Sequence, residues 1–227
     1  MAKFRQVSHV IFDMDGVILD TEPLYTKAVQ NVLNKYNRTF TWEVKAGMMG
    51  LHRFEASKYI VNKLNLPITW EEYDTEIHKE YQVVLANPTV FPGTQKLIRH
   101  LSKHNIPISV ATSSSLESFE LKSAQHKDLF KLFDHIVCGS SDPDVKQGKP
   151  APDIFLVSAA RFPDKPNPEK CLVLEDSPNG VQAAISAGMQ VIMVPDENIP
   201  MELREAASFV VSSVDETPLE KFGLPPL

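Results

Sequence analysis

Two aspartates stand two positions apart at the end of an apolar run: Asp13 and Asp15 follow Val10–Phe12, and Gly16 comes directly after them. Two ionised carboxylates this close repel each other, so a site that uses both usually holds a cation or a shifted proton. The glycine allows the chain to turn sharply at this point. The pattern indicates a pair of acids presented by a buried strand, although Asp and Gly are also common in ordinary turns.

A run of hydroxyl side chains, from Thr112 to Ser115, follows a second apolar run and leads into a helix-like stretch. Hydroxyls and backbone N–H groups at the start of a helix bind phosphate well. Thr112 and Ser113 are therefore candidate phosphate contacts. An ordinary helix cap is the other interpretation, because Ser and Thr are preferred at that position.

A lysine and a second acid pair complete the set of candidates. Lys149 is held in a stiff, proline-flanked segment, where it can offer a fixed positive charge to a phosphate or an aspartate. Glu175 and Asp176 end another apolar run. Mg²⁺ prefers oxygen ligands, typically one or two carboxylates with water and substrate phosphate. Asp13 and Asp176 would suffice if two parallel strands bring them together; the alternative role of Asp176 is to cap the helix expected after it.

A further turn, from Gly47 to Arg53, carries His52 and Arg53. A surface turn is one interpretation, and a lid that presents side chains to a ligand is the other. The first acid pair, the hydroxyl run, the lysine and the second acid pair also occur in this order, each after or between strand-like runs. Their joint occurrence favours a single site over four independent turns and caps.

The stretches that must position these residues alternate between strand-like and helix-like patterns. Apolar runs rich in β-branched residues, with little polar alternation, are typical of a parallel sheet covered on both faces. Amphipathic stretches between them predict a doubly wound α/β fold, in which ligands bind at the carboxyl ends of the strands. The predicted strands are Val7–Phe12, Ile106–Ala111, His135–Cys138, Cys171–Leu174, Gln190–Val194 and Ser208–Val211, and the predicted helices are Thr94–His104, Ser115–Gln125, Pro152–Arg161, Pro178–Ala187 and Met201–Ala206.

The stretch from about Asp20 to Pro88 does not fit this alternation. It has helical periodicity throughout, beginning with Thr21 as an N-cap and Pro23 in the first turn. A helical stretch of about 70 residues is far more than a crossover between parallel strands needs. We expect a helical domain over residues 20–88, inserted into a catalytic α/β core formed by residues 1–19 and 89–227.

Composition excludes several classes of protein. The 227 residues are 43% hydrophobic with a net charge of −6, which argues against a nucleic-acid binder held by a broad basic surface. Cys138 and Cys171 form no CxxC motif or Cys/His cluster, which argues against a structural zinc site and favours a reducing compartment. Glycine-rich nucleotide motifs and any run of 18 apolar residues are absent from the sequence, and we expect no signal peptide, because the first apolar stretch is short and interrupted by Asp13 and Asp15. We therefore expect a soluble, cytoplasmic protein.

In this arrangement the chain resembles the haloacid dehalogenase superfamily, in its phosphatase branch with a small helical cap and a Rossmann-like core. The resemblance covers nearly the whole chain, because Asp13–Gly16, Thr112, Lys149 and the pair Glu175 and Asp176 match the four motifs in order. Within the superfamily the chain is similar to the pseudouridine-5′-phosphatase group. The segments that carry this similarity are Ile106–Ile108, Ala111–Ser114, Asp142–Val145, Lys170–Gly180, Ala187–Val191 and Phe222–Pro225.

The resemblance implies a phosphomonoesterase that works through an aspartyl-phosphate. Asp13 would be the nucleophile that attacks phosphorus. Asp15 would be the general acid for the leaving alcohol and then the base that activates water. Thr112 and Lys149 would hold phosphoryl oxygens, with Ser113 beside them as a further substrate contact.

The resemblance also implies a Mg²⁺ cofactor and a substrate contact in the cap. Asp13, the Asp15 carbonyl and Asp176 would bind Mg²⁺, with Glu175 assisting, and the ion would offset the repulsion between the nucleophile and the phosphate. The cap would close over the leaving group and exclude water. Arg53 would contact the substrate from the cap.

Several activities stay open at this point. Pseudouridine 5′-phosphate is the first substrate suggested, and glycerol 3-phosphate or another sugar phosphate the second. A phosphomutase of the β-phosphoglucomutase type shares all four motifs but has a histidine where Tyr25 stands here, and a dehalogenase generally lacks the second aspartate, Asp15. A non-enzymatic phosphoacceptor resembling a receiver domain is usually near half this length and has no inserted cap. We expect a monomer that acts on a small phosphorylated metabolite and binds neither nucleic acid polymers nor membranes.

Overall fold

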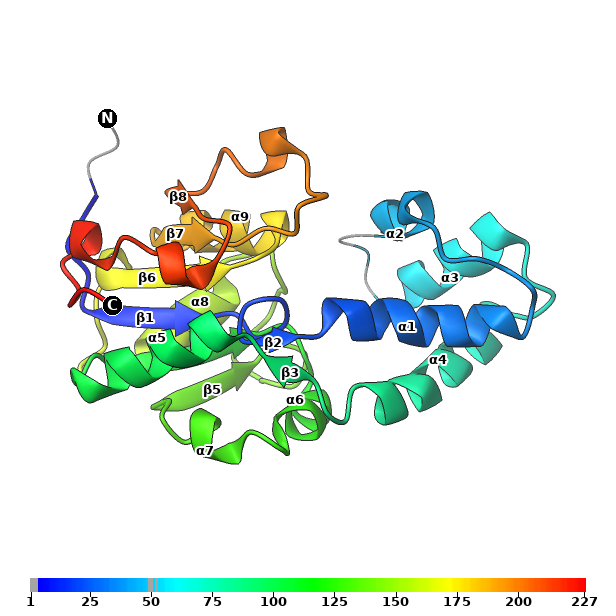
Figure 1. Cartoon of the computed structure of the whole chain (residues 1–227), viewed down its shortest axis with the longest axis horizontal. Coiled ribbons are helices and arrows are strands. Elements are labelled where there is room, and N and C mark those ends of the chain that lie inside the picture. The colour runs from blue at the N-terminus through cyan, green and yellow to red at the C-terminus, as the bar shows by residue number, and fades with distance from the viewer. Residues whose placement is uncertain (1–3, 49–50, 52) are drawn as a thin grey trace. The chain divides into compact units, whose positions relative to one another are not determined.

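The computed structural model describes residues 4–48, 51 and 53–227, and the chain divides into two compact units. One unit consists of Met1–Asp20 and Thr89–Leu227, and the other of Thr21–Pro88. The first is a sheet flanked by helices and the second is helical (Figure 1). None of the described helices is long and apolar enough to cross a membrane.

The first unit is built on a six-stranded parallel sheet in the order β5-β4-β1-β6-β7-β8. From β1 the chain runs outward through β4 and β5, then returns to β6 on the other side of β1. This strand order confirms the predicted fold class and its doubly wound topology. In open α/β sheets, ligands bind where the strand order reverses in this way. The strands are β1 (His9–Phe12), β4 (Ile108–Thr112), β5 (His135–Cys138), β6 (Cys171–Glu175), β7 (Gln190–Met193) and β8 (Phe209–Val210).

Helices cover both faces of this sheet (Figure 1). They are α5 (Pro92–Lys103), α6 (Leu116–Ser123), α7 (Lys127–Phe130), α8 (Asp153–Arg161) and α9 (Pro178–Ser186). Val10 and Phe12 of β1 join an apolar cluster with α5, whereas Ile11 points into the opposite cluster with α8 and α9. Because alternate residues of a strand face opposite sides, burial on both sides requires an unbroken apolar run. This requirement explains why the strands could be predicted from such runs.

Two local features differ from the predictions. A short antiparallel pair, β2 (Leu19–Asp20) with β3 (Thr89–Val90), was not predicted, because strands of two residues show no periodicity. The helix predicted over Met201–Ala206 is wrong: only a 3₁₀ turn forms, at Met201–Leu203. Its apolar residues, Met201 and Leu203, are more than half exposed, so no packed face stabilises a longer helix. Other 3₁₀ turns lie at Pro168–Lys170, Val214–Glu216 and Leu219–Phe222.

The second unit has its own apolar core. Its described helices are α1 (Glu22–Asn34), α2 (Trp42–Met48), α3 (Arg53–Leu64) and α4 (Trp70–Val84). α4 packs against both α1 and α3, and a capping box between Thr69 and Glu72 satisfies the first N–H groups of α4. The core residues at this interface include Ala28, Val29, Val32, Leu33, Ile60, Tyr73 and Ile77.

Candidate active site

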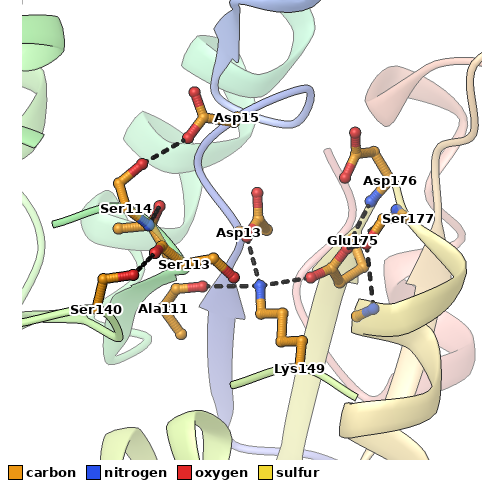
Figure 2. A network of polar contacts seen from close by, with 12 residues as sticks. Asp13, Asp15, Ala111, Ser113, Ser114, Ser140, Lys149, Glu175, Asp176 and Ser177 are labelled. Carbon is orange, nitrogen blue, oxygen red and sulfur yellow. Dashed lines mark hydrogen bonds and ion pairs between the residues drawn. The ribbon is translucent and has the colours of Figure 1, made fainter. Parts of the chain in front are cut away.

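The ends of three neighbouring strands bring the predicted residues of the first unit together (Figure 2). Asp13 follows β1 directly, and its N–H donates to the Leu174 carbonyl at 2.9 Å, which extends the pairing of β1 with β6 by one residue. Thr112 ends β4 and Glu175 ends β6. Because the strands are parallel and in register, their carboxyl ends meet at one edge of the sheet.

Lys149 lies at the centre of this group (Figure 2). Its ammonium donates to Oδ1 of Asp13, to Oε1 of Glu175 at 2.6 Å and to the Ala111 carbonyl at 3.1 Å. The lysine side chain is only 6% exposed, and those of Asp13 and Glu175 are 9% and 1% exposed. All three donor hydrogens of the buried ammonium are therefore used, and one cation faces two carboxylates.

Burial and charge shift the pKa values of this pair. Burial raises the pKa of Asp13 to about 7, and the nearby carboxylates of Glu175 and Asp15 add to the rise, against the lowering effect of Lys149. Burial by itself lowers the pKa of Lys149, but Asp13 and Glu175 outweigh it and leave that pKa above its ordinary value. Lys149 is thus a permanent positive charge, whereas a second cation beside Asp13 would favour its ionised form.

Glu175 has both carboxyl oxygens occupied. Oε1 accepts from Lys149, and Oε2 accepts from the N–H of Asp176 at 3.0 Å and from the N–H and hydroxyl of Ser177 at 3.0 and 3.1 Å. Gly180, in the first turn of α9, provides the room: a Cβ there would lie 1.8 Å from Cδ of Glu175. These contacts hold the lysine and shape the turn that carries Asp176.

Asp176 lies against the backbone of the loop that follows β1. Gly16 in this loop has a φ of +82°, and a Cβ at that position would lie 2.1 Å from Oδ2 of Asp176. The carboxyl group therefore occupies space that only a glycine leaves open. Within the described ranges no group of three or more His, Cys, Asp or Glu side chains has the arrangement of a metal site. A site here would depend on two carboxylates, a backbone carbonyl, and oxygens of substrate and water.

The hydroxyl run after β4 takes up distinct positions. Thr112 is 1% exposed, and its Oγ1 accepts from the N–H of Ser114 at 3.1 Å, so its own hydrogen is left to donate. Ser113 is exposed, and its carbonyl accepts from the hydroxyl of Ser140 at 2.7 Å. The side chain of Ser115 accepts from the N–H of Ser118 at 3.2 Å, and so caps α6.

Asp15 has a partner that sequence reasoning missed. Lys122, in the last turn of α6, is fully buried and donates from Nζ to both carboxyl oxygens of Asp15, at 2.7 and 2.6 Å. The same ammonium donates to Oγ of Ser114 at 2.7 Å, and that hydroxyl donates to Oδ2 of Asp15 at 3.1 Å. The only signal in the sequence is that Lys122 follows Phe119 by one helical turn, on a face that turns inward.

Arg53 lies at the start of α3 and is paired within the second unit. Its guanidinium bonds to both carboxyl oxygens of Asp74, at 3.0 and 2.6 Å. This pairing lowers the pKa of Asp74 and raises that of Arg53, and Ser57 adds a third bond to the carboxylate at 3.2 Å. His52, in the turn predicted from Gly47 to Arg53, lies outside the described residues, as do Met49 and Gly50.

Comparison with known proteins shows what this chain is similar to. The family model of the haloacid dehalogenase-like hydrolases matches residues 7–188. The chain is 48% identical over 221 residues to the Drosophila melanogaster protein named "Probable pseudouridine-5′-phosphatase", covering 97% of this chain and 96% of that one. It is 42% identical over 223 residues to (DL)-glycerol-3-phosphatase 2 of Arabidopsis thaliana, with coverages of 97% and 92%.

A solved structure extends the likeness to the whole fold. The crystal structure of a hydrolase of the same family from Deinococcus radiodurans, with bound phosphate and sodium, matches the full length of both chains with a TM-score of 0.80. The two sequences are 23% identical, so this likeness concerns the fold alone.

Proposed function

This chain belongs to the haloacid dehalogenase-like hydrolases and is a phosphatase of small phosphorylated metabolites, and from this premise we propose that it hydrolyses pseudouridine 5′-phosphate through a phosphoaspartate on Asp13. The observation that carries the proposal is the buried contact between Asp13 and Lys149 at the carboxyl end of β1. It fixes a carboxylate at the reversal point of the sheet, next to a permanent positive charge that suits a phosphoryl group.

The first half-reaction uses both aspartates. A carboxylate oxygen of Asp13 attacks phosphorus, and the bond from phosphorus to the leaving alkoxide oxygen breaks. The carboxyl group of Asp15 donates a proton to that oxygen, so the nucleoside leaves as a neutral alcohol. Lys149 and the free hydroxyl hydrogen of Thr112 bind the phosphoryl oxygens and spread the charge that develops on them.

The second half-reaction restores the enzyme. Asp15, now ionised, takes a proton from a water molecule as the water oxygen attacks phosphorus. The bond between phosphorus and the Asp13 oxygen breaks, which releases phosphate and the free carboxylate. Asp15 thus ends protonated, as it began, and the net reaction consumes one water.

The proposed ligands fit Mg²⁺ in their chemistry. They are all oxygens: the carboxyl groups of Asp13 and Asp176 and the carbonyl of Asp15. The Gly16 backbone leaves a cradle for the Asp176 carboxyl, so this group is held at the loop that carries the other two. We propose that these three residues bind Mg²⁺, which when present would neutralise the negative charges of nucleophile and phosphate. Because both Glu175 oxygens are engaged, we assign Glu175 to positioning Lys149.

Two relatives suggest two substrates. The pseudouridine assignment is supported by the Drosophila relative, and the name of the Arabidopsis relative makes glycerol 3-phosphate the second candidate. Both are alkyl phosphomonoesters, so the chemistry proposed for Asp13 and Asp15 is the same for either. The difference concerns recognition of the leaving group.

The deciding experiment is phosphate release from a panel of phosphomonoesters, measured with Mg²⁺ and with excess chelator. The panel contains pseudouridine 5′-phosphate, uridine 5′-phosphate, glycerol 3-phosphate and β-glucose 1-phosphate. We expect chelator-sensitive release with the highest kcat/KM for pseudouridine 5′-phosphate. Preference for glycerol 3-phosphate would overturn the substrate assignment, and formation of glucose 6-phosphate without phosphate release would identify a phosphomutase.

A further inference from the structure

Lys122 is an unusual residue for a protein interior. Its side chain is fully buried, although lysine is rarely buried unless it is paired. Its ammonium donates to Oδ1 and Oδ2 of Asp15 and to Oγ of Ser114 over distances between 2.6 and 2.7 Å. Removing Asp15 would leave this buried ammonium without its main partner, which is costly, so the contact holds both side chains in place.

The pair with Asp15 repeats the arrangement found at Asp13. Lys149 reaches Asp13 from the loop before α8, and Lys122 reaches Asp15 from α6. Each acid of the β1 loop therefore has its own buried lysine, supplied by a different part of the first unit. The contact spans 107 residues of sequence, so tertiary packing and not local turn chemistry sets the position of Asp15.

Ser114 makes the position of Asp15 still more exact. Its hydroxyl accepts from Lys122 and donates to Oδ2 of Asp15, so that Lys122, Ser114 and Asp15 form a ring of hydrogen bonds in which each residue contacts the other two. Figure 2 shows the Asp15 carboxyl directed toward Ser114, at the end of β4. The N–H of Ser114 is in turn bonded to Thr112, one of the proposed phosphate contacts. The ring thus connects the acid of the first loop to the strand end that would bind phosphate.

We propose that Lys122 is a positioning residue for the reaction: together with Ser114 it holds the Asp15 carboxyl at the place from which a proton reaches the leaving oxygen. This inference rests on the proposed role of Asp15. Holding a reacting group in place removes orientational cost from the barrier, and a displacement of about 1 Å can cost about 100-fold in rate. The benefit is confined to leaving groups that need a proton.

Because only some leaving groups need a proton, a comparison of two substrates distinguishes a positioning role of Lys122 from a general structural role. An alkyl phosphate such as pseudouridine 5′-phosphate or glycerol 3-phosphate leaves as a basic alkoxide and needs the acid. The 4-nitrophenolate of 4-nitrophenyl phosphate is stable without a proton and does not. Damage to the whole site would reduce both reactions, whereas displacement of Asp15 reduces the first much more than the second.

The test compares Lys122→Met, Lys122→Arg and Ser114→Ala in the full chain on both kinds of substrate. For Lys122→Met we expect kcat on the alkyl phosphate to fall about 100-fold, with KM within about 3-fold, and kcat on 4-nitrophenyl phosphate to fall less than about 5-fold. Lys122→Arg keeps the cation and should recover part of the loss. Lys131→Met, which breaks the exposed pair with Asp128, is the matched control and should leave both rates unchanged.

Each outcome supports or overturns the inference. Equal losses on both substrates, or no loss for Lys122→Met, would overturn it. If Lys122→Met does not fold, Ser114→Ala carries the test, and we expect the same selective loss at a magnitude of about 10-fold. Asp15→Asn distinguishes failure of the inference from failure of the proposed function: it must itself lose mainly the alkyl reaction, and if it does not, the acid role of Asp15 is what fails.

Discussion

A Cβ added to Gly16 would lie 2.1 Å from Oδ2 of Asp176, so the loop after β1 and the acid after β6 fit together only because residue 16 has no side chain. This contact joins the two strand ends on either side of the chain reversal. It also makes a glycine necessary for a second reason, because its φ is +82°.

Gly16→Ala should therefore damage the metal site more than the fold. We expect the Mg²⁺ concentration for half-maximal activity to rise about 10-fold or more, because the Asp176 carboxyl must move, and the free energy of unfolding to fall by about 1–2 kcal/mol. Mg²⁺ titration of activity and urea unfolding measure the two effects. Gly188→Ala is the matched control: φ there is +79°, but no atom lies within 4 Å of the added Cβ, so it reports backbone strain alone. Equal Mg²⁺ dependence in the two variants would refute the steric argument.

Asp13→Asn should abolish turnover and preserve the fold. The amide is not nucleophilic, so we expect phosphate release to fall at least about 10⁴-fold, while Lys149 keeps its bonds to Glu175 and Ala111. Circular dichroism and urea unfolding check the fold, and acid quenching of the wild-type reaction should trap a phosphoprotein that the variant lacks. Asp128→Asn, at an exposed carboxylate, is the control. Full activity of the Asp13 variant would refute the mechanism.

Glu175→Gln tests the assignment of this acid to positioning. The glutamine amide has an NH₂ group in place of one carboxyl oxygen. This group would face either the ammonium of Lys149 or the N–H of Ser177, so two buried hydrogen-bond donors would point at each other. We expect a loss of about 2–3 kcal/mol in the free energy of unfolding and a fall in kcat of about 10–100-fold, with only a small change in the Mg²⁺ requirement. Glu169→Gln, at an exposed position, should change none of these. If the Mg²⁺ requirement changed most, Glu175 would be acting as a metal ligand.

Arg53→Ala should make the stability of the second unit less dependent on acid pH. Arg53 lowers the pKa of Asp74, so the pair stabilises the folded state fully above the ordinary value of 3.8, and this contribution is lost as pH falls through the lowered folded value. Because the guanidinium is 53% exposed, we expect a loss of no more than about 1 kcal/mol at pH 7.

Urea unfolding at several pH values between 7 and 3 measures this difference, which should shrink below about pH 4. Lys27→Ala changes an exposed lysine in the same unit and serves as the control. If the stability difference between the wild type and Arg53→Ala stayed constant from pH 7 to pH 3, the ion pair between Arg53 and Asp74 would not be its cause. The same variant tests Arg53 as a substrate contact, for which we expect a higher KM or a lower kcat on the natural substrate.

The sequence determined the fold class and the order in which the motifs occur along the predicted strands and loops. A parallel sheet buries both faces of its strands, so β1 and β6 carry the apolar runs Val10–Phe12 and Cys171–Leu174, and those runs are visible in the sequence. Their acids follow directly, because a site at the end of a strand lies next to the strand in sequence. For this reason Asp13 and Glu175 were predicted as members of one group, with Lys149 added from the proline-flanked segment, and the three are found in contact.

Tertiary structure alone decided the partners of these residues. The helix that carries Lys122 was predicted, but this lysine was not singled out, and its contact with Asp15 depends on how α6 packs, 107 residues away in sequence. Arg53 and Asp74 pair across α3 and α4, and Glu175 is directed to Lys149 because Gly180 leaves it space. Patterns of apolar and turn-forming residues predict burial and chain reversal, because both depend on residues that are neighbours in sequence. Pairings between buried charges depend on the packing of distant elements, and a sequence pattern does not contain them.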